Sequence, residues 1–206
     1  MYRFINEHCD LAITKLGAID PRDYLELCKR MQSDVNATSD MQFQRRYRNY
    51  WRMNVARLGE GFYKRYFELL AECQQSRSID IPRLAKELRA TTKKRSLQFS
   101  FATKLAHMVD PRIPVYDSFV AAFYFYEPPA GSFGKRLKEL MKFHDFLRGE
   151  YERVIREGLL NQAIRKFRDR YPPCDSLCNE RIIDWLIWSC VSLLQDKVKE
   201  GAAIYQ

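Results

Sequence analysis

The amino-acid sequence predicts an all-helical protein, built as one compact domain of many helices. The chain of 206 residues is 46% hydrophobic, which is enough apolar material to bury a sizeable core. It has only eight glycines and eight prolines, whereas a β-sandwich or barrel needs a turn every 8–12 residues or so. Signals for helix starts also recur along the chain, each followed by an apolar run of helical periodicity.

The helix-start signals place the elements in order. Side chains that cap helix N-termini, or a proline in the first turn, mark these positions: Asp20-Pro21, Ser39-Asp40, Asp80 before Pro82, Ser132, and Asn179 before Glu180. Combined with the apolar periodicity, they predict helices over the following ranges: 3–16, 21–34, 40–57, 60–75, 80–92, 96–108, 117–126, 133–148, 150–170 and 180–198.

Two proline-rich breaks interrupt this series. Residues 127–131 and 171–174 each contain a proline pair, which cannot continue a helix. Both breaks are too short to act as flexible linkers, so we expect a single domain over residues 1–206. An arrangement in two lobes, 1–130 and 131–206, with a groove between them, is the alternative.

The pattern of cysteines and the lengths of the apolar runs indicate the cellular compartment of the protein. The chain begins without a signal peptide and its six cysteines are scattered, a pattern typical of reduced cytosolic thiols. The longest apolar run, Trp185–Val191, falls far short of the ~20 residues that span a bilayer. We therefore expect a cytoplasmic protein with no membrane partner.

Metal and nucleotide sites have little support in the sequence. Cys174 and Cys178 have a spacing compatible with zinc, but a structural zinc site needs four ligands and only Cys190 lies near in sequence. Residues 59–61 have neither the third glycine nor the preceding strand of a phosphate-cradling loop. We expect no metal ion and no cofactor.

Positive charge is concentrated in two stretches. The formal net charge is +9, to which residues 42–66 contribute +6 and residues 89–104 contribute +5, so the rest of the chain sums to −2. Concentrated basic charge indicates binding of a polyanion such as DNA. The alternative is that both stretches are ordinary solvated helix faces.

The helix expected over 40–57 has two different faces. Phe43, Tyr47, Tyr50 and Trp51 form an apolar stripe at helical spacing, which we assign to the core in preference to a platform for stacking bases. A second face carries the candidate phosphate-binding side chains, Arg45, Arg48 and Arg52.

Lys104 lies on a largely apolar helix at the boundary between core and surface, beside Ser100 and His107. A lysine must lose its proton to act as a nucleophile, and partial burial or a nearby cation lowers its pKa. Lys93, Lys94 and Arg95 are candidates for such cations. The alternative is a lysine that extends from a buried stem to water, and we expect His107 to be a hydrogen-bonded histidine at the edge of a groove.

Asp117 follows a break with two prolines, Asp110–Pro114, and opens an apolar helix. A carboxylate at this position caps the helix by accepting a hydrogen bond from an otherwise unpaired backbone N–H. Capping alone explains an aspartate here, so a role in chemistry would be additional.

The two runs Phe99–Ala106 and Ile113–Val120 together resemble the lysine and aspartate elements of the helix-hairpin-helix DNA glycosylases. In particular they look like the 8-oxoguanine glycosylase-like proteins of bacteria. Lys104 with Ala106, and Pro114-Val115 with Asp117, match the positions of that motif. The resemblance implies a helix-hairpin-helix-like element near residues 96–126, with residues 100–102 at the position of its glycine-containing turn.

The resemblance also implies a chemistry. Lys104 would attack C1′ of a flipped nucleotide, expel the base and leave a Schiff base, and strand cleavage by β-elimination would follow. Asp117 would orient the nucleophile and stabilise positive charge on the sugar. The flanking phosphates of duplex DNA would be bound by the hairpin at Ser100 and by the basic stretches that contain Lys93, Lys94, Arg95, Arg45, Arg48 and Arg52.

Two further hypotheses remain open. One is a helical nucleic-acid-binding module that keeps the fold without the chemistry, and the other is a protein-interaction module. Steep salt dependence of DNA binding would favour the first of these, and its absence the second.

Overall fold

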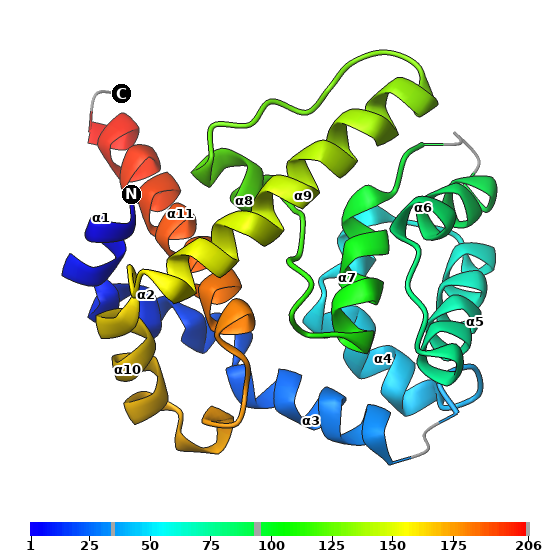
Figure 1. Ribbon diagram of the computed structural model, residues 1–206, viewed down its shortest axis with the longest axis horizontal. Coiled ribbons are helices and arrows are strands. Elements are labelled where there is room, and N and C mark those ends of the chain that lie inside the picture. The colour runs from blue at the N-terminus through cyan, green and yellow to red at the C-terminus, as the bar shows by residue number, and fades with distance from the viewer. Residues whose placement is uncertain (34–35, 93–95, 205–206) are drawn as a thin grey trace.

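The computed structural model describes residues 1–33, 36–92 and 96–204, and every regular element within these ranges is a helix. The prediction of an all-helical fold is confirmed (Figure 1). Among the described helices, none combines the length with the apolar character that crossing a membrane requires. Lys93, Lys94 and Arg95, three of the candidate DNA-binding residues, lie outside the described residues.

The α-helices follow one another along the chain as α1 (Tyr2–Glu7), α2 (Cys9–Lys15), α3 (Pro21–Gln32), α4 (Met41–Tyr50), α5 (Glu60–Ser76), α6 (Ile81–Ala90), α7 (Phe99–Val109), α8 (Ser118–Phe123), α9 (Phe133–Arg156), α10 (Asn161–Arg170) and α11 (Asn179–Ile204). Within the described ranges, three short 3-10 helices lie between them, η1 (Leu16–Ile19), η2 (Met53–Ala56) and η3 (Pro172–Cys174).

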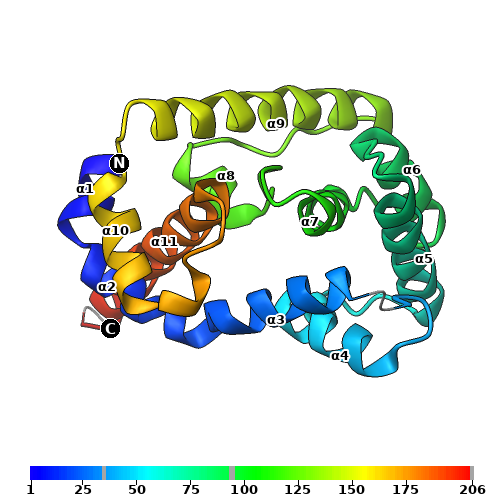
Figure 2. The same cartoon turned by 60° about the horizontal axis from the view of Figure 1, so that its bottom comes forward.

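Helix α7 lies in the middle of the fold. Figure 2 shows it nearly end-on, with α9 above it, α3 and α4 below it, α5 and α6 on one side and α8 with α11 on the other. Its sequence explains this position, because most of its residues are apolar and eight of them are buried. A helix that is apolar almost all round is stable only when other helices cover it.

Five of the predicted caps begin helices where the sequence placed them, whereas Asn179 is itself the first residue of α11. The side chains of five residues accept a hydrogen bond from a backbone N–H two or three positions further on, namely Asp20, Asp40, Asp80, Asp117 and Ser132. Each cap satisfies a donor that the helix itself leaves unpaired. The predicted core stripe on α4 is also confirmed for Phe43, Tyr47 and Trp51, which are buried, whereas Tyr50 is half-buried.

Several helix ends differ from the predictions. The helix expected over 3–16 is broken at His8, whose backbone leaves the helical region. The helix expected over 40–57 ends after Tyr50, because Arg52 adopts a left-handed conformation with φ of 52°. Left-handed backbone at a non-glycine residue has no clear sequence signal and interrupts a right-handed helix.

The expected break between residues 148 and 150 is wrong. Helix α9 passes straight through Gly149, where a glycine only weakens a helix, and ends at Arg156. The chain turns instead at Gly158, which has φ of 65° and therefore takes the conformation that glycine tolerates best.

The turn that the resemblance implies at residues 100–102 is absent from these residues, and the hairpin near residues 96–126 stays a prediction. Residues 100–102, expected to form a turn, are part of the continuous helix α7. Ser100-Phe101-Ala102 has no glycine that would favour a turn, and Phe101 and Ala102 are buried in the core.

A candidate lysine–aspartate pocket

Lys104 and Asp117 line the same cavity. Its volume is about 610 Å³, and its walls come from the C-terminal end of α4 with η2, from α7, from the N-terminus of α8 and from the first half of α11. Two other sequence candidates, Arg52 and Ser100, also line it. We call this cavity the lysine–aspartate pocket.

The wall residues are a mixture of aromatic, apolar and charged side chains. Within the described part of the chain, the charged groups that line the pocket are Arg52, Lys104, Asp117, Arg181 and Asp184. The aromatic side chains are Tyr50, Trp51, Phe119, Trp185 and Trp188. A second cavity, of about 500 Å³, adjoins it, because Ile19, Tyr50, Arg52 and Trp188 line both.

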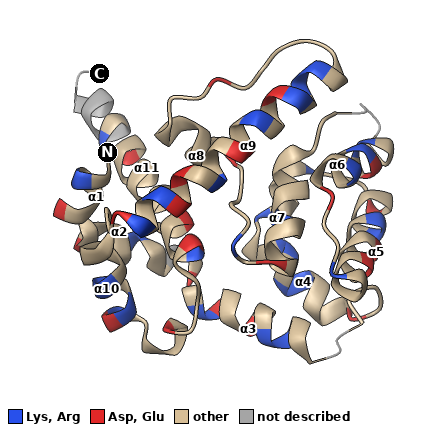
Figure 3. Ribbon diagram, viewed as in Figure 1, with Lys and Arg blue, Asp and Glu red and all other residues tan. Residues whose placement is uncertain are grey.

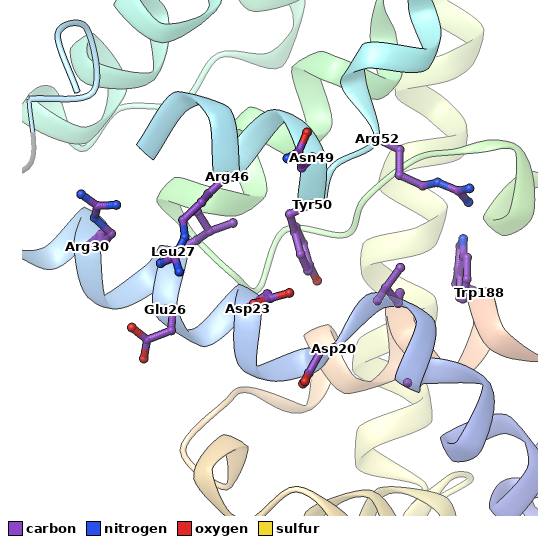
Figure 4. A pocket seen from close by; sticks show the side chains of 12 residues that line it. Asp20, Asp23, Glu26, Leu27, Arg30, Arg46, Asn49, Tyr50, Arg52 and Trp188 are labelled. Carbon is purple, nitrogen blue, oxygen red and sulfur yellow. The ribbon is translucent and has the colours of Figure 1, made fainter. Parts of the chain in front are cut away.

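Figure 4 shows this second cavity, with Arg46 and Tyr50 extending from α4 toward α3, and the Arg52 guanidinium beside the Trp188 ring. Three carboxylates on or next to α3, Asp20, Asp23 and Glu26, line the opposite side. Because basic and acidic groups face each other here, the second cavity is not uniformly attractive to an anion.

The Lys104 side chain is half-buried on α7. Its Nζ lies 5.3 Å from the centre of the Phe101 ring and 5.8 Å from the centre of the Trp51 ring. Burial lowers the pKa of the Lys104 amine below its ordinary value, and although the Asp117 charge opposes this shift, the charges of Arg181 and Arg52 reinforce it. The pocket therefore favours the neutral amine more than water does.

Asp117 serves as the N-cap of α8. Its Oδ1 accepts hydrogen bonds from the backbone N–H groups of Phe119 and Val120, each at 2.9 Å. Its Oδ2 accepts no hydrogen bond from the described residues, which leaves one carboxylate oxygen for a ligand. These two hydrogen bonds hold the carboxylate at the wall of the pocket. The helix that Asp117 caps, α8, is short.

The segment that leads to Asp117 is held by hydrogen bonds from three helices. Four contacts fix its backbone: His107 Nδ1 donates to the Ile113 carbonyl (2.7 Å), His144 Nε2 donates to the Pro114 carbonyl (3.0 Å), the Val115 N–H donates to Asp184 Oδ2 (3.3 Å), and the Tyr116 N–H donates to Thr103 Oγ1 (3.1 Å). With each of the residues before Asp117 tied in this way, the position of its carboxylate is set by α7, α9 and α11.

His107 is part of this support and is not at the edge of a groove as the sequence predicted. Its side chain is fully buried, and its Nε2 accepts a hydrogen bond from the Tyr24 hydroxyl at 3.0 Å. Burial lowers the pKa of His107 to about 3. The expectation of a hydrogen-bonded histidine is confirmed, and a neutral ring fits both of its contacts.

Sequence reasoning did not identify Arg181 and Asp184 as pocket residues. Both are buried, on the first two turns of α11, and Arg181 Nη1 lies 3.8 Å from Asp184 Oδ2. Asp184 Oδ1 also accepts a hydrogen bond from the Tyr151 hydroxyl at 2.6 Å. Burial raises the pKa of Asp184 to about 7. Their i, i+3 spacing was visible in the sequence, but it is also typical of an exposed ion pair.

The three arginines predicted to bind phosphate have different environments. Arg45 is exposed on α4, and Arg52 is exposed at the mouth of the pocket. Arg48 is engaged by the protein, since its guanidinium lies 3.7 Å from the centre of the Tyr63 ring and its Nε donates to Asn54 Oδ1. Figure 3 shows that Lys and Arg also occur on α9 and α10, away from α4.

An exposed apolar side chain lies beside Arg52. Val55, on η2, is 76% exposed and lines the pocket. The backbone before Val55 is fixed by Met53, which is fully buried and whose carbonyl accepts a hydrogen bond from the Tyr63 hydroxyl. After Val55, Arg57 adopts a left-handed conformation with φ of 49°. Strained backbone of this kind is often found at functional sites.

The cysteines form no metal site in the described part of the chain. No group of three or more potential ligands gathers there. Cys178 instead donates from its Sγ to the Pro111 carbonyl.

Comparison with known proteins adds no relative. No family model, curated protein or solved structure matches this chain.

Proposed function

We propose that the protein processes damaged nucleotides in duplex DNA, with Lys104 as the nucleophile and Asp117 as the group that stabilises charge on the sugar. The observation that carries this proposal is that Lys104 and Asp117 line one cavity. The pKa of Lys104 is lowered there, and Asp117 Oδ2 accepts no hydrogen bond from the described residues. A volume of about 610 Å³ lies within the range of small-ligand sites.

The proposed reaction begins when a nucleotide leaves the duplex and enters the pocket. Lys104 Nζ forms a bond to C1′ of the sugar as the glycosidic bond breaks, and the base leaves with that electron pair and takes up a proton. Nζ then loses a proton and its lone pair forms the C=N bond as the C1′–O4′ bond breaks, and O4′ takes up the proton, which gives the Schiff base. The carboxylate of Asp117 stabilises the positive charge that develops on the sugar in the transition state.

The walls suit a nucleotide in two further ways. Phe119 and Trp188, whose ring centres are 5.5 Å apart, provide aromatic surface of the kind on which bases stack. Arg52 and Val55 lie at the mouth, and a basic side chain next to an exposed apolar one suits a duplex from which a base has been removed.

All six cysteines are free, which fits a protein of the reducing cytoplasm.

Borohydride trapping tests this proposal. Wild-type protein is incubated with duplexes that carry 8-oxoguanine or an abasic site, and borohydride reduces any Schiff base to a stable covalent complex. We expect a complex with wild type and none with Lys104→Ala. Lys138→Ala, at an exposed lysine on α9, is the matched control and should trap as wild type does. Absence of a complex on every lesion, or equal trapping by Lys104→Ala, would sink the proposal.

The arginines of α4 should contribute unequally to DNA affinity. We expect Arg45→Gln and Arg52→Gln each to make the slope of log affinity against log salt shallower by about one unit, because each removes one exposed phosphate contact. Arg48→Gln should change the slope less, since Arg48 already contacts Tyr63 and Asn54. Fluorescence anisotropy at several salt concentrations measures these slopes, and an equal change for all three would contradict this ranking.

The continuous helix at residues 100–102 favours a second candidate function. Without a turn at these residues, the backbone there approaches a phosphate less closely, so a helical module that binds DNA without processing it is the alternative. Salt-dependent binding in the absence of any trapped complex would favour this second function.

A further inference from the structure

A buried arginine lies in the wall of the lysine–aspartate pocket. The Arg181 side chain is almost fully buried, with its guanidinium carbon 4.4 Å from the centre of the Trp185 ring and 4.5 Å from that of the Tyr24 ring. Its Nη2 donates a hydrogen bond to the Tyr50 hydroxyl. Because arginine stays protonated in proteins, these contacts fix a permanent positive charge at one position.

The surroundings neutralise this charge only in part. Asp184 is 3.8 Å from Arg181 Nη1, but the same carboxylate accepts hydrogen bonds from the Tyr151 hydroxyl and the Val115 N–H. Within the described part of the chain, Arg181 Nε is buried without a hydrogen-bond partner. Asp184 itself is partly protonated near neutral pH, since burial raises its pKa to about 7.

Arg181 and Lys104 contact the same indole ring. The Arg181 guanidinium carbon lies 5.0 Å from the centre of the Trp51 ring, and Lys104 Nζ lies 5.8 Å from it. Adding a proton to Lys104 therefore puts a second positive charge against one ring. Lysine is the member of this pair that can give up its proton.

Other groups around Lys104 act on it in opposite directions. From α8, Asp117 favours the protonated amine, while the exposed Arg52 after α4 disfavours it. Asp184 on α11 and Tyr50 on α4 also line the pocket, and the buried His107 on the next turn of α7 is neutral. Arg181 differs from Arg52 in being shielded from solvent, so its field is screened less.

We propose that Arg181 is a positioning residue for Lys104, whose fixed charge in the aromatic wall keeps the lysine amine in the neutral, nucleophilic form. This inference deepens the proposed function, in which Lys104 attacks the sugar. It concerns the amine alone, however, and is tested without DNA.

Competitive labelling of the intact protein tests it. Trace amounts of an amine-acylating reagent are added between pH 6 and 11, and mass spectrometry of peptides gives the extent of labelling at each lysine. The midpoint of each pH profile reports protonation independently of how accessible the lysine is. Lys138, which is exposed on α9, serves as the internal reference. We expect Lys104 to have a lower midpoint than Lys138 in wild type.

Substitutions around Lys104 and Arg181 should shift the Lys104 midpoint, some upward and others downward. Arg181→Met should raise the Lys104 midpoint and reduce its labelling at pH 7 by about fivefold, because it removes a positive charge that solvent screens little. Arg52→Gln, at an exposed position, should reduce it by less than about twofold. Asp184→Asn, which removes the partial counter-charge of Arg181, should lower the midpoint, and so should Asp117→Asn.

Circular dichroism establishes that each variant is folded. If folded Arg181→Met has the wild-type profile, or if Lys104 and Lys138 have the same midpoint in wild type, the proposal is overturned. Should Arg181→Met not fold, an unchanged midpoint in Asp184→Asn overturns it instead. Because no DNA is present, a failure here is distinct from a failure to trap a covalent complex.

Discussion

Replacing Asp117 with asparagine should leave the protein folded and remove most of its activity on damaged DNA. An asparagine side chain caps a helix about as well as an aspartate, so its amide oxygen can accept the two N–H bonds that Asp117 Oδ1 accepts now. The negative charge that stabilises the developing cation on the sugar is lost. We expect the rate to fall by about 100-fold or more, as with other preorganised charge-stabilising groups, and the free energy of unfolding to change by less than about 1 kcal/mol.

Two variants separate capping from chemistry at this position. Asp117→Ala removes both the cap and the charge, and should cost about 1 kcal/mol of stability besides the activity. Asp80→Asn makes the same chemical change at the N-cap of α6, where the carboxylate accepts the Arg83 N–H, and should leave activity intact. Single-turnover assays and urea denaturation measure the two effects. If Asp117→Asn turns over at the wild-type rate, the carboxylate is only a cap.

The parts of this site that could be predicted from the sequence are those fixed by local physics. A cap such as Asp117 acts on the N–H groups two and three positions further on, so its role depends only on neighbouring residues. Lys104 lies on a helix whose apolar pattern already indicated burial next to a polar boundary. The segment between them is short, which limited how far apart they can lie.

The remaining parts depend on contacts between distant segments. Asp184 meets Val115 across 69 positions, and His144 meets Pro114 across 30. Arg181 belongs to a residue type that is almost never fully buried unless it is paired, so nothing in the sequence placed it between aromatic rings. The left-handed Arg52, which ends α4 and turns its side chain to the pocket mouth, also has no local signal.

Asp184 should make stability fall as pH rises, and Asp184→Asn should remove this effect. The folded protein holds the Asp184 proton with a pKa of about 7, whereas the ordinary value is 3.8. Between these two pH values the unfolded chain has lost the proton and the folded chain has not, so each increase in pH favours unfolding. A shift of this size corresponds to roughly 4 kcal/mol as an upper bound. Relative to wild type, we expect Asp184→Asn to gain stability steadily from pH 4 to pH 7.

His107 makes stability change with pH in the opposite direction, so the wild-type protein does not show the full decrease that Asp184 causes. Its pKa is about 3 in the folded state against an ordinary 6.5, so stability rises with pH between these values and is lost on acidification. The two groups offset each other between about pH 4 and pH 6.5, and Asp184→Asn should expose the rising slope of His107. Urea denaturation at half-unit intervals of pH measures both proteins, with Glu152→Gln as the control at an exposed carboxyl group on α9. A stability difference between Asp184→Asn and wild type that stays constant from pH 4 to pH 8 would show that Asp184 is ionised throughout, and its partnership with Arg181 would then be a full ion pair.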